Sequence, residues 1–343
     1  MKKLFIISFI VIVVVIISLG LVLGSGTAFH EKEQYFIIEQ GKTDKENILN
    51  TLKEKHIVKH TALFSVIASK MNVWNKIKPG KYKVKRGENL LSIARMLRNN
   101  RQAQINLVIN KLRIKEDFAK LIGKNFSTDS ASVMQFITSN DSLKNYQVDS
   151  NTVFTLLIPD TYTFYWSTPL RKIFNRLYEA KNNFWKKNNR TKQATAQGFT
   201  PDQIYIIASI VEEETNVDAD KGNIASVYMN RVKKNIPLQS DPTIKYAMKD
   251  FDLIRIYEKY LFTPSPYNTY RNNGLPPGPI CTPSVKTIDS VLNAPETNYL
   301  FFVGIGLTNK LHFSSTFAEH HIYAQEYRKA LDAYMAKKQD ENK

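Results

Sequence analysis

Three consecutive glutamates, Glu212, Glu213 and Glu214, end a strongly apolar segment and are the first candidates for acid–base chemistry. Along a helix that turns about 100° per residue, the isoleucines and valine before them form a stripe centred near Ile207. Glu214 comes seven residues after Ile207 and projects near the middle of that stripe. Glu212 projects to about the opposite side and Glu213 to one flank, so we expect three different environments.

A carboxyl group aligned with a buried stripe is poorly solvated, which raises its pKa. A carboxyl that keeps its proton near neutral pH can act as a general acid. Periodicity leaves two alternatives open for Glu214. The helix could fray after Val211 and leave all three glutamates in water, or Glu214 could pair with an arginine such as Arg231.

The helix that must position these glutamates has a well-defined start at Thr200-Pro201-Asp202-Gln203. These residues supply a hydroxyl cap, a proline at the first helical position, an acid near the positive end of the helix dipole and a glutamine three residues after the cap. We expect one helix to run from there through the glutamates. The string "NIASVYMNRVKKN" predicts a second helix that ends near Asn235.

Loops rich in aromatic rings, amides and hydroxyls follow this second helix, and such groups suit a sugar polymer. For each candidate a packing or backbone-binding role is the alternative. Asp241 is predicted to be a substrate-loop residue and not a second acid, because the aspartate of a Ser-Asp-Pro turn commonly caps its own backbone. The candidate substrate-binding residues are Asn230, Arg231, Gln239, Ser240, Asp241, Thr243, Tyr267, Asn268, Tyr270 and Pro276.

The histidines and the single cysteine do not predict a metal centre. His312, the pair His320 and His321, and the isolated Cys281 match no closed zinc-site spacing. We therefore expect neither a metal nor another cofactor, and a surface or core role for each histidine.

The N-terminal segment predicts a membrane anchor. Residues 4–29 carry no charged side chain and are mostly Ile, Val, Leu and Phe, long enough to cross a bilayer core of about 30 Å. Lys2 and Lys3 precede the segment, so the positive-inside rule places residues 1–3 in the cytoplasm and the rest of the chain outside. Small residues at 25–28 keep a cleaved signal peptide as the alternative. The expected location is the cytoplasmic membrane, with one span.

The chain is strongly basic, with 48 Lys+Arg against 31 Asp+Glu and a formal net charge of +17. No nucleic-acid signature accompanies this charge, and an external domain rarely meets nucleic acid. We therefore expect a surface that faces anionic lipid headgroups or an anionic wall polymer. A polar stretch is expected to be a solvated face or linker, with cations at Lys181, Lys186, Lys187, Arg190 and Lys192.

The fold class predicted for the external part is α+β, in three blocks at 30–125, 126–199 and 200–343. In the first, "KYKVKRGENLLSIARML" predicts a strand, a turn at Gly87 and an amphipathic helix. This string is similar to a LysM-type carbohydrate-binding segment, although a plain core role is the alternative. In the second block we expect a turn at Pro159-Asp160-Thr161-Tyr162, capped by Asp160, and a helix around Leu177 and Trp185.

Six strings occur in the order and at about the spacing found in the endolytic murein transglycosylases of the YceG-like family, which the chain therefore resembles. They are "ASIVEEET", "ASVYMNR", "LQSDPTIKYAM", "YNTY", "GLPPGPICTPS" and "HFSSTFAEHH". One departure is Phe154-Thr155, where the family often has a Glu-Gly pair. The resemblance implies that Glu214 is the catalytic residue and that no metal is used.

The same resemblance implies a membrane-anchored enzyme that acts in cell-wall assembly and glycan-strand termination. Such an enzyme cuts the β-1,4 bond between N-acetylmuramic acid and N-acetylglucosamine in nascent peptidoglycan and leaves a 1,6-anhydro end. Its implied partners are peptidoglycan glycan strands, the cytoplasmic membrane and peptidoglycan synthases. Two readings from other classes stay open: a catalytically silent wall-binding scaffold, and a metal-dependent hydrolase of the wall.

Overall fold

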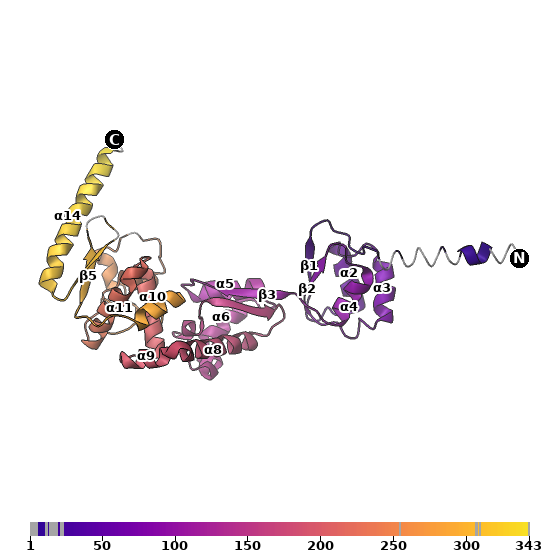
Figure 1. Cartoon of the computed structure of the whole chain (residues 1–343), viewed down its shortest axis with the longest axis horizontal. Coiled ribbons are helices and arrows are strands. Elements are labelled where there is room, and N and C mark those ends of the chain that lie inside the picture. The colour runs from indigo at the N-terminus through magenta and orange to yellow at the C-terminus, as the bar shows by residue number, and fades with distance from the viewer. Residues whose placement is uncertain are drawn as a thin grey trace. The chain divides into compact units, whose positions relative to one another are not determined.

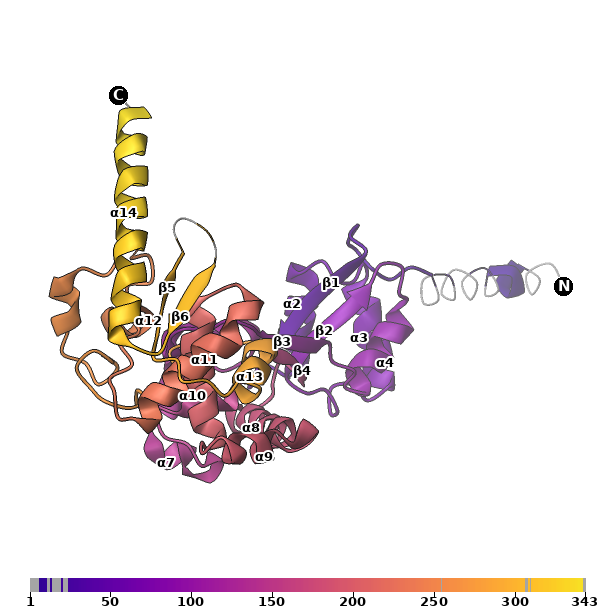
Figure 2. The ribbon, with the colours of Figure 1, turned by 60° about the vertical axis from the view of Figure 1, so that its left-hand side comes forward.

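The computed structural model describes residues 6–10, 13, 20, 24–253, 255–305, 308 and 310–341. The chain is a mixed α+β protein with small two-stranded sheets, as predicted. It divides into two compact units (Figures 1 and 2). Unit 1 comprises the described residues up to Leu107 with residues 122–129 and 162–170, and unit 2 comprises residues 108–121, 130–161 and those from Arg171 onward. The predicted block 126–199 is thus shared between the units.

In the part of unit 1 between residues 33 and 98, one antiparallel sheet packs with helices. Its elements are β1 (Glu33–Ile38), α2 (Lys45–Glu54), α3 (Thr61–Lys70), β2 (Gly80–Lys85) and α4 (Leu90–Arg98). Phe36 of β1 lies opposite Tyr82 of β2, and their rings stack with centroids 5.6 Å apart. The strand, the turn at Gly87 (φ +89°) and the helix predicted for this region are confirmed. The LysM-like assignment stays a prediction.

The predicted anchor, residues 4–29, falls mainly on residues outside those described. In the described part of the chain, no helix combines the length and the apolar character that a bilayer span requires. The last residues of the predicted segment belong to unit 1, where Thr27 and Phe29 are buried and Thr27 forms a β-bridge with Val58. The folded part of unit 1 therefore begins before residue 30.

Two boundaries between the units, after Leu107 and after Thr161, fall within strands. β3 (Gln104–Ile109) and β4 (Asp160–Tyr165) form a two-stranded sheet. Asp160, predicted to lie in a turn, is the first residue of β4, and its Oδ1 accepts a hydrogen bond of 2.7 Å from the backbone of Thr161.

Unit 2 is mainly helical and carries one antiparallel sheet, β5 paired with β6. Its principal elements, with α5 and α8 shared at their ends with unit 1, are α5 (Lys115–Asn125), α6 (Ser130–Thr138), α7 (Asn140–Leu143), α8 (Leu170–Lys186), α9 (Arg190–Ala196), α10 (Pro201–Glu214), α11 (Asp218–Lys233), α12 (Asp241–Met248), α13 (Val285–Leu292), β5 (Phe301–Gly304), β6 (Leu311–Ser314) and α14 (Phe317–Glu341). Short 3-10 turns lie at Lys144–Tyr146, Val153–Leu156, Lys187–Asn189 and Glu258–Phe262.

Helix α10 is the centre of unit 2, and its start is as predicted. The side chain of Thr200 accepts from the backbone of Gln203, and the side chain of Gln203 accepts from the backbone of Thr200. The predicted single apolar stripe is too narrow, since every residue from Ile204 to Val211 is buried. Tyr205 is among these buried residues, and its hydroxyl is satisfied there because it donates to the carbonyl of Leu157 at 2.7 Å. A helix enclosed on all sides holds its last turn in a fixed place.

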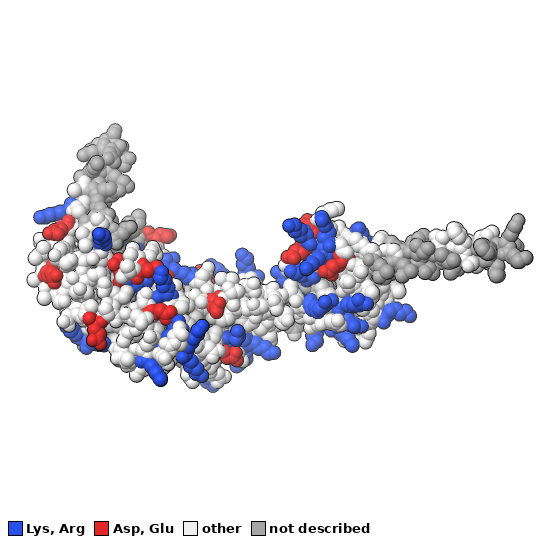
Figure 3. Space-filling view, viewed as in Figure 1, with Lys and Arg blue, Asp and Glu red and all other residues white. Residues whose placement is uncertain are grey.

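The basic stretch predicted to be solvated is only partly so. Lys181 is buried and donates to Thr155 at 2.9 Å while forming an ion pair of 2.6 Å with Asp202. Arg190 is also buried and forms an ion pair with Asp289, with 2.7 Å between Nε and Oδ1. Their partners come from distant parts of the sequence, which local composition does not reveal. Other lysines and arginines are spread over the described surface of both units on the face shown in Figure 3.

Candidate functional site

The three glutamates at the end of α10 point to three different places, as the helical geometry predicts. Consecutive helical residues are separated by about 100°, so each carboxylate has its own partners. None of the three is freely solvated, which contradicts the alternative of a frayed helix end. The side chains of Glu212 and Glu213 are only 16% and 14% exposed.

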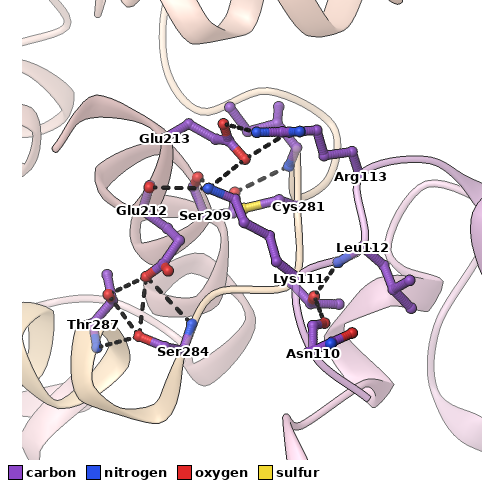
Figure 4. A network of polar contacts seen from close by, with 12 residues as sticks. Asn110, Lys111, Leu112, Arg113, Ser209, Glu212, Glu213, Cys281, Ser284 and Thr287 are labelled. Atoms are coloured by element: carbon purple, nitrogen blue, oxygen red, sulfur yellow. Dashed lines mark hydrogen bonds and ion pairs between the residues drawn. The ribbon is translucent and has the colours of Figure 1, made fainter. Parts of the chain in front are cut away.

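Glu212 and Glu213 are fully engaged in structural contacts (Figure 4). Glu212 accepts hydrogen bonds from Ser284 (3.0 Å) and Thr287 and lies 3.7 Å from the ammonium group of Lys221. The carboxylate of Glu213 accepts hydrogen bonds from Nε and Nη2 of Arg113, both at 3.0 Å, and lies 3.0 Å from the ammonium group of Lys111. Burial acts to raise the pKa of Glu213, but hydrogen bonds from Arg113 and Lys111 outweigh it and lower that pKa. Glu213 is therefore an anion.

Glu214 has a different environment and no cationic hydrogen-bond partner among the described residues. Its Oε1 accepts from the hydroxyl of Tyr228 on α11 and from the hydroxyl of Ser240, at 2.8 Å, just before α12. Burial raises the pKa of Glu214, and the two hydroxyl donors only partly offset this. Burial also raises the pKa of Tyr228 well above its ordinary value, so that hydroxyl remains a donor. Arg231 does not pair with Glu214.

Glu214 lines two cavities. One, which we call the basic cavity after its lysines and arginine, has a volume of about 250 Å³ and is bounded by Lys111, Arg113, Glu212, Glu213, Asn216, Lys245 and Phe251, among others. The other, the aromatic cavity, has a volume of about 310 Å³ and is bounded by Tyr228, Arg231, Gln239, Asp241, Tyr270, Phe301, Phe302 and His320, among others. A group that enters either cavity meets the same carboxyl, whose pKa burial raises.

Half of the predicted substrate-binding residues either contact the carboxyl of Glu214 or line the aromatic cavity beside it. Ser240 binds it directly, while Arg231, Gln239, Asp241 and Tyr270 line the aromatic cavity. Arg231 is buried and donates to the carbonyls of Pro237 and Leu300 and to the side chain of Gln239. Asp241 accepts from the hydroxyl of Tyr270 at 2.6 Å instead of capping its own backbone.

The other five candidates line neither cavity and serve the surrounding structure. Asn230 donates to the carbonyls of Thr297 and Tyr299. Thr243 is buried and bonds to the carbonyl of Ser240. Asn268 is buried and donates to two loop carbonyls, Tyr267 packs on Tyr246 at 4.6 Å, and Pro276 is buried in its loop. The side chains of Thr243 and Asn268 thus bind the loops that carry Ser240 and Tyr270, whereas Asn230 connects α11 to the segment before β5.

Several residues of the site could not be predicted from the sequence. Tyr228 stands inside the string "ASVYMNR", but nothing in its periodicity points to a carboxyl 14 positions earlier. Lys111 and Arg113 lie about 100 positions before Glu213, and Lys245 lies within the motif "LQSDPTIKYAM". The sequence shows that these lysines and this arginine are positively charged, but it does not show that they lie close together in the fold.

The histidines have separate surroundings. His312 lies 3.3 Å from Glu319 and stacks on Tyr323, whereas His320 stacks on Phe301 and borders the aromatic cavity. Burial lowers the pKa of His320. Among the residues that the structure describes, no group of three His, Cys, Asp or Glu side chains could hold a metal ion.

The raised pKa of Glu214 predicts a pH-dependent gain in stability for Glu214→Gln. A carboxyl whose pKa is higher in the folded chain than in the unfolded chain stabilises the fold below the unfolded pKa, and this contribution is lost as pH rises through the folded pKa. We therefore expect the glutamine variant to be the more stable protein at high pH and to lose this advantage in acid. Urea unfolding over a pH series measures the difference, and a variant less stable at high pH would contradict the burial argument.

The fold and site together define a mixed α+β protein in which one buried carboxyl with a raised pKa lines both an aromatic and a basic cavity. The chain matches the YceG-like family over residues 36–326. It belongs to that family.

Two bacterial proteins are similar to the chain over about half of its length. It is 35% identical over 176 residues to the endolytic murein transglycosylase of Bacillus subtilis (strain 168), covering 50% of this chain and 47% of that protein. It is 28% identical over 194 residues to the endolytic murein transglycosylase of Streptococcus pneumoniae serotype 2, covering 55% of this chain and 34% of that protein. The matches thus span about half or less of these relatives.

A solved structure matches over a larger share of the chain. The crystal structure of a yceG-like protein from Listeria monocytogenes has a TM-score of 0.55 and 27% sequence identity. The match covers 85% of this chain and 99% of that one. The fold of the family therefore extends over most of both chains.

Proposed function

We propose that the chain is an endolytic peptidoglycan lytic transglycosylase that cuts between N-acetylmuramic acid and N-acetylglucosamine. The observation that carries the proposal is the state of Glu214, a carboxyl with a raised pKa that faces two cavities. The names of the Bacillus subtilis and Streptococcus pneumoniae relatives, endolytic murein transglycosylases, support the same substrate and reaction class.

The hydrogen bonds of Glu214 assign separate tasks to its two oxygens. Oε1 accepts from Tyr228 and Ser240, so the proton is best placed on Oε2. From there it would be donated to the glycosidic oxygen as the bond to the anomeric carbon breaks. The same hydroxyl donors stabilise the carboxylate that remains, because hydrogen bonds to a charged acceptor are stronger than those to a neutral one.

The second half of the reaction needs only this one carboxylate. Glu214 takes the proton from the 6-hydroxyl of the muramic acid, and that oxygen attacks the anomeric carbon to close the 1,6-anhydro ring. No water is consumed. Glycosidases that use water need two carboxylates, whereas a nucleophile carried by the substrate gains the advantage of proximity.

The proposed place of action rests on the N-terminal segment. The apolar residues of the segment 4–29 would anchor the chain in the cytoplasmic membrane by one span, with the folded residues from Thr27 onward outside. There the net charge of +17 would favour anionic lipids and the wall polymer. Nascent glycan strands are the proposed substrate, peptidoglycan synthases are the proposed neighbours, and strand termination during wall assembly is the proposed role.

The experiment that tests the function is mass analysis of products from purified glycan strands, with the wild-type chain and with Glu214→Gln. The expected result is anhydro ends from the wild type alone. Hydrated reducing ends would contradict the anhydro product, and activity lost on adding a chelator would favour a metal-dependent hydrolase. Wall digestion that is the same with and without Glu214 would favour the silent scaffold.

Tyr228→Phe is predicted to shift the pH profile to the alkaline side. The hydroxyl of Tyr228 lowers the pKa of Glu214, so its removal raises that pKa further. Since the protonated acid is the active form, kcat/KM falls as pH rises through this pKa, and the alkaline limb should move to higher pH. The maximal kcat/KM should fall about tenfold because one positioning hydrogen bond is lost. The profile is measured against wild type and Ser240→Ala, and an alkaline limb that moves to lower pH would contradict the assignment.

A further inference from the structure

We propose that the basic cavity binds a carboxylate group of the substrate, carried by the muramic acid beside the bond that Glu214 cleaves. The inference rests on the proposed function, which supplies the polymer, and adds a requirement for an acidic substituent on it. Muramic acid bears a lactyl group whose carboxyl is either free or extended by a peptide stem with carboxylates of its own. Both sources offer the same chemistry.

The first observation is how the three cations and three glutamates that line the cavity are paired. Lys111 and Arg113 share a single carboxylate, that of Glu213, and Lys245 contributes a third cation to the lining. Glu212, which also lines the cavity, is held by Lys221, Ser284 and Thr287, none of which belongs to the lining. Of the three cations in the lining, Lys245 is thus the one that these carboxylates leave without an ion pair among the described residues.

The second observation is that Lys245 is unpaired. Within the described ranges, its ammonium group makes no hydrogen bond or ion pair, although it is partly buried on α12. Its charge acts on Glu214, whose pKa it lowers, but within the same ranges no carboxylate lies at ion-pair distance from it. An incoming carboxylate would supply the missing partner through a charge-assisted hydrogen bond.

The third observation concerns the way in which Arg113 is held. Its guanidinium gives Nε and one terminal nitrogen to Glu213, at 3.0 Å each, and stacks on Phe251 at 5.1 Å. In the described part of the chain the other terminal nitrogen, Nη1, has no hydrogen-bond partner. A guanidinium fixed on two sides presents its remaining donors in one direction, which favours binding of a planar carboxylate.

The position of the cavity favours a substituent near the cleaved bond over a group at the end of the strand. Glu214 forms part of the wall of both cavities. With a sugar ring in the aromatic cavity beside Tyr270 and Phe302, the basic cavity is reached at the same carboxyl. The lactyl group of muramic acid is attached close to the ring that reacts, so it is within reach of this cavity.

The test compares kcat/KM on three substrates for the wild type, Lys245→Met and Lys172→Met. The substrates are strands with acidic peptide stems, strands stripped of stems that keep a free lactyl carboxylate, and stripped strands with that carboxylate blocked as the methylamide. Lys172 is the matched control, because it is exposed on α8 and lines neither cavity. Thermal melting checks that each variant is folded.

We expect the wild type and Lys172→Met to prefer a carboxylate-bearing strand over the methylamide by about tenfold. Lys245→Met should lose most of this preference, so that its kcat/KM on the carboxylate-bearing strand approaches its own kcat/KM on the methylamide strand. A preference for stemmed strands identifies the peptide as the source, and a preference for stripped strands identifies the lactyl group. Raising the ionic strength should weaken the preference in either case.

Two results would overturn the inference: equal rates of the wild type on all three strands, or an equal loss by Lys245→Met on all three. Failure of the proposed function has a different signature, since the wild type then cleaves none of the strands. In that case calorimetric binding of the stripped and methylamide strands to Glu214→Gln decides the inference, and equal affinities refute it.

Discussion

Glu214→Gln is expected to cleave glycan strands about 1,000-fold more slowly than the wild-type chain, because it removes the group that both gives and takes the proton. Glutamine has nearly the same shape and can still accept from Tyr228 and Ser240, so the fold should be intact. The rate of soluble product release, followed by chromatography, measures the loss. A residual rate above a tenth of the wild type would exclude Glu214 as the proton donor.

The neighbouring glutamates supply the matched controls for this variant. Glu212→Gln and Glu213→Gln remove carboxylates of the same helix turn that bind Ser284 and Arg113 instead of facing the aromatic cavity. We expect these variants to be less stable, because each leaves a cation with a weakened partner. Their rates at a temperature where they are folded should stay far above that of Glu214→Gln.

Arg231→Met is expected to lower the free energy of unfolding by about 3 kcal/mol, because it leaves buried acceptors unpaired. The guanidinium holds the carbonyls of Pro237 and Leu300 and the side chain of Gln239. These acceptors belong to the loop before α12 and to the start of β5, which border the aromatic cavity. Activity should therefore fall together with stability. Urea unfolding at neutral pH measures the change.

Arg271→Met is the control for this second prediction. Arg271 is exposed and donates to a single carbonyl, that of Phe262, so its loss should cost less than about 1 kcal/mol. Equal effects of the two substitutions would contradict the structural role assigned to Arg231. A fully stable but inactive Arg231→Met would instead point to direct substrate contact.

The sequence by itself determined the local geometry of the site. The capping box at Thr200 fixed where α10 begins, and the angular spacing along the helix separated Glu214 from Glu212 and Glu213. The strand, turn and helix around Gly87 were equally predictable. All of these depend on residues within a few positions of one another, because backbone dihedrals and side-chain direction in a helix or strand follow from local sequence.

Only the tertiary structure decided which distant side chains surround Glu214. Tyr228 and Ser240 meet one carboxyl oxygen from separate elements, and Lys111 and Arg113 arrive from 100 positions earlier. Asn268 and Thr243, chosen for the same chemical reasons as Ser240, instead close their own loops. Residue type and spacing give the groups available for hydrogen bonding, but which groups pair depends on how helices and loops pack, and such long-range contacts leave no local period to detect.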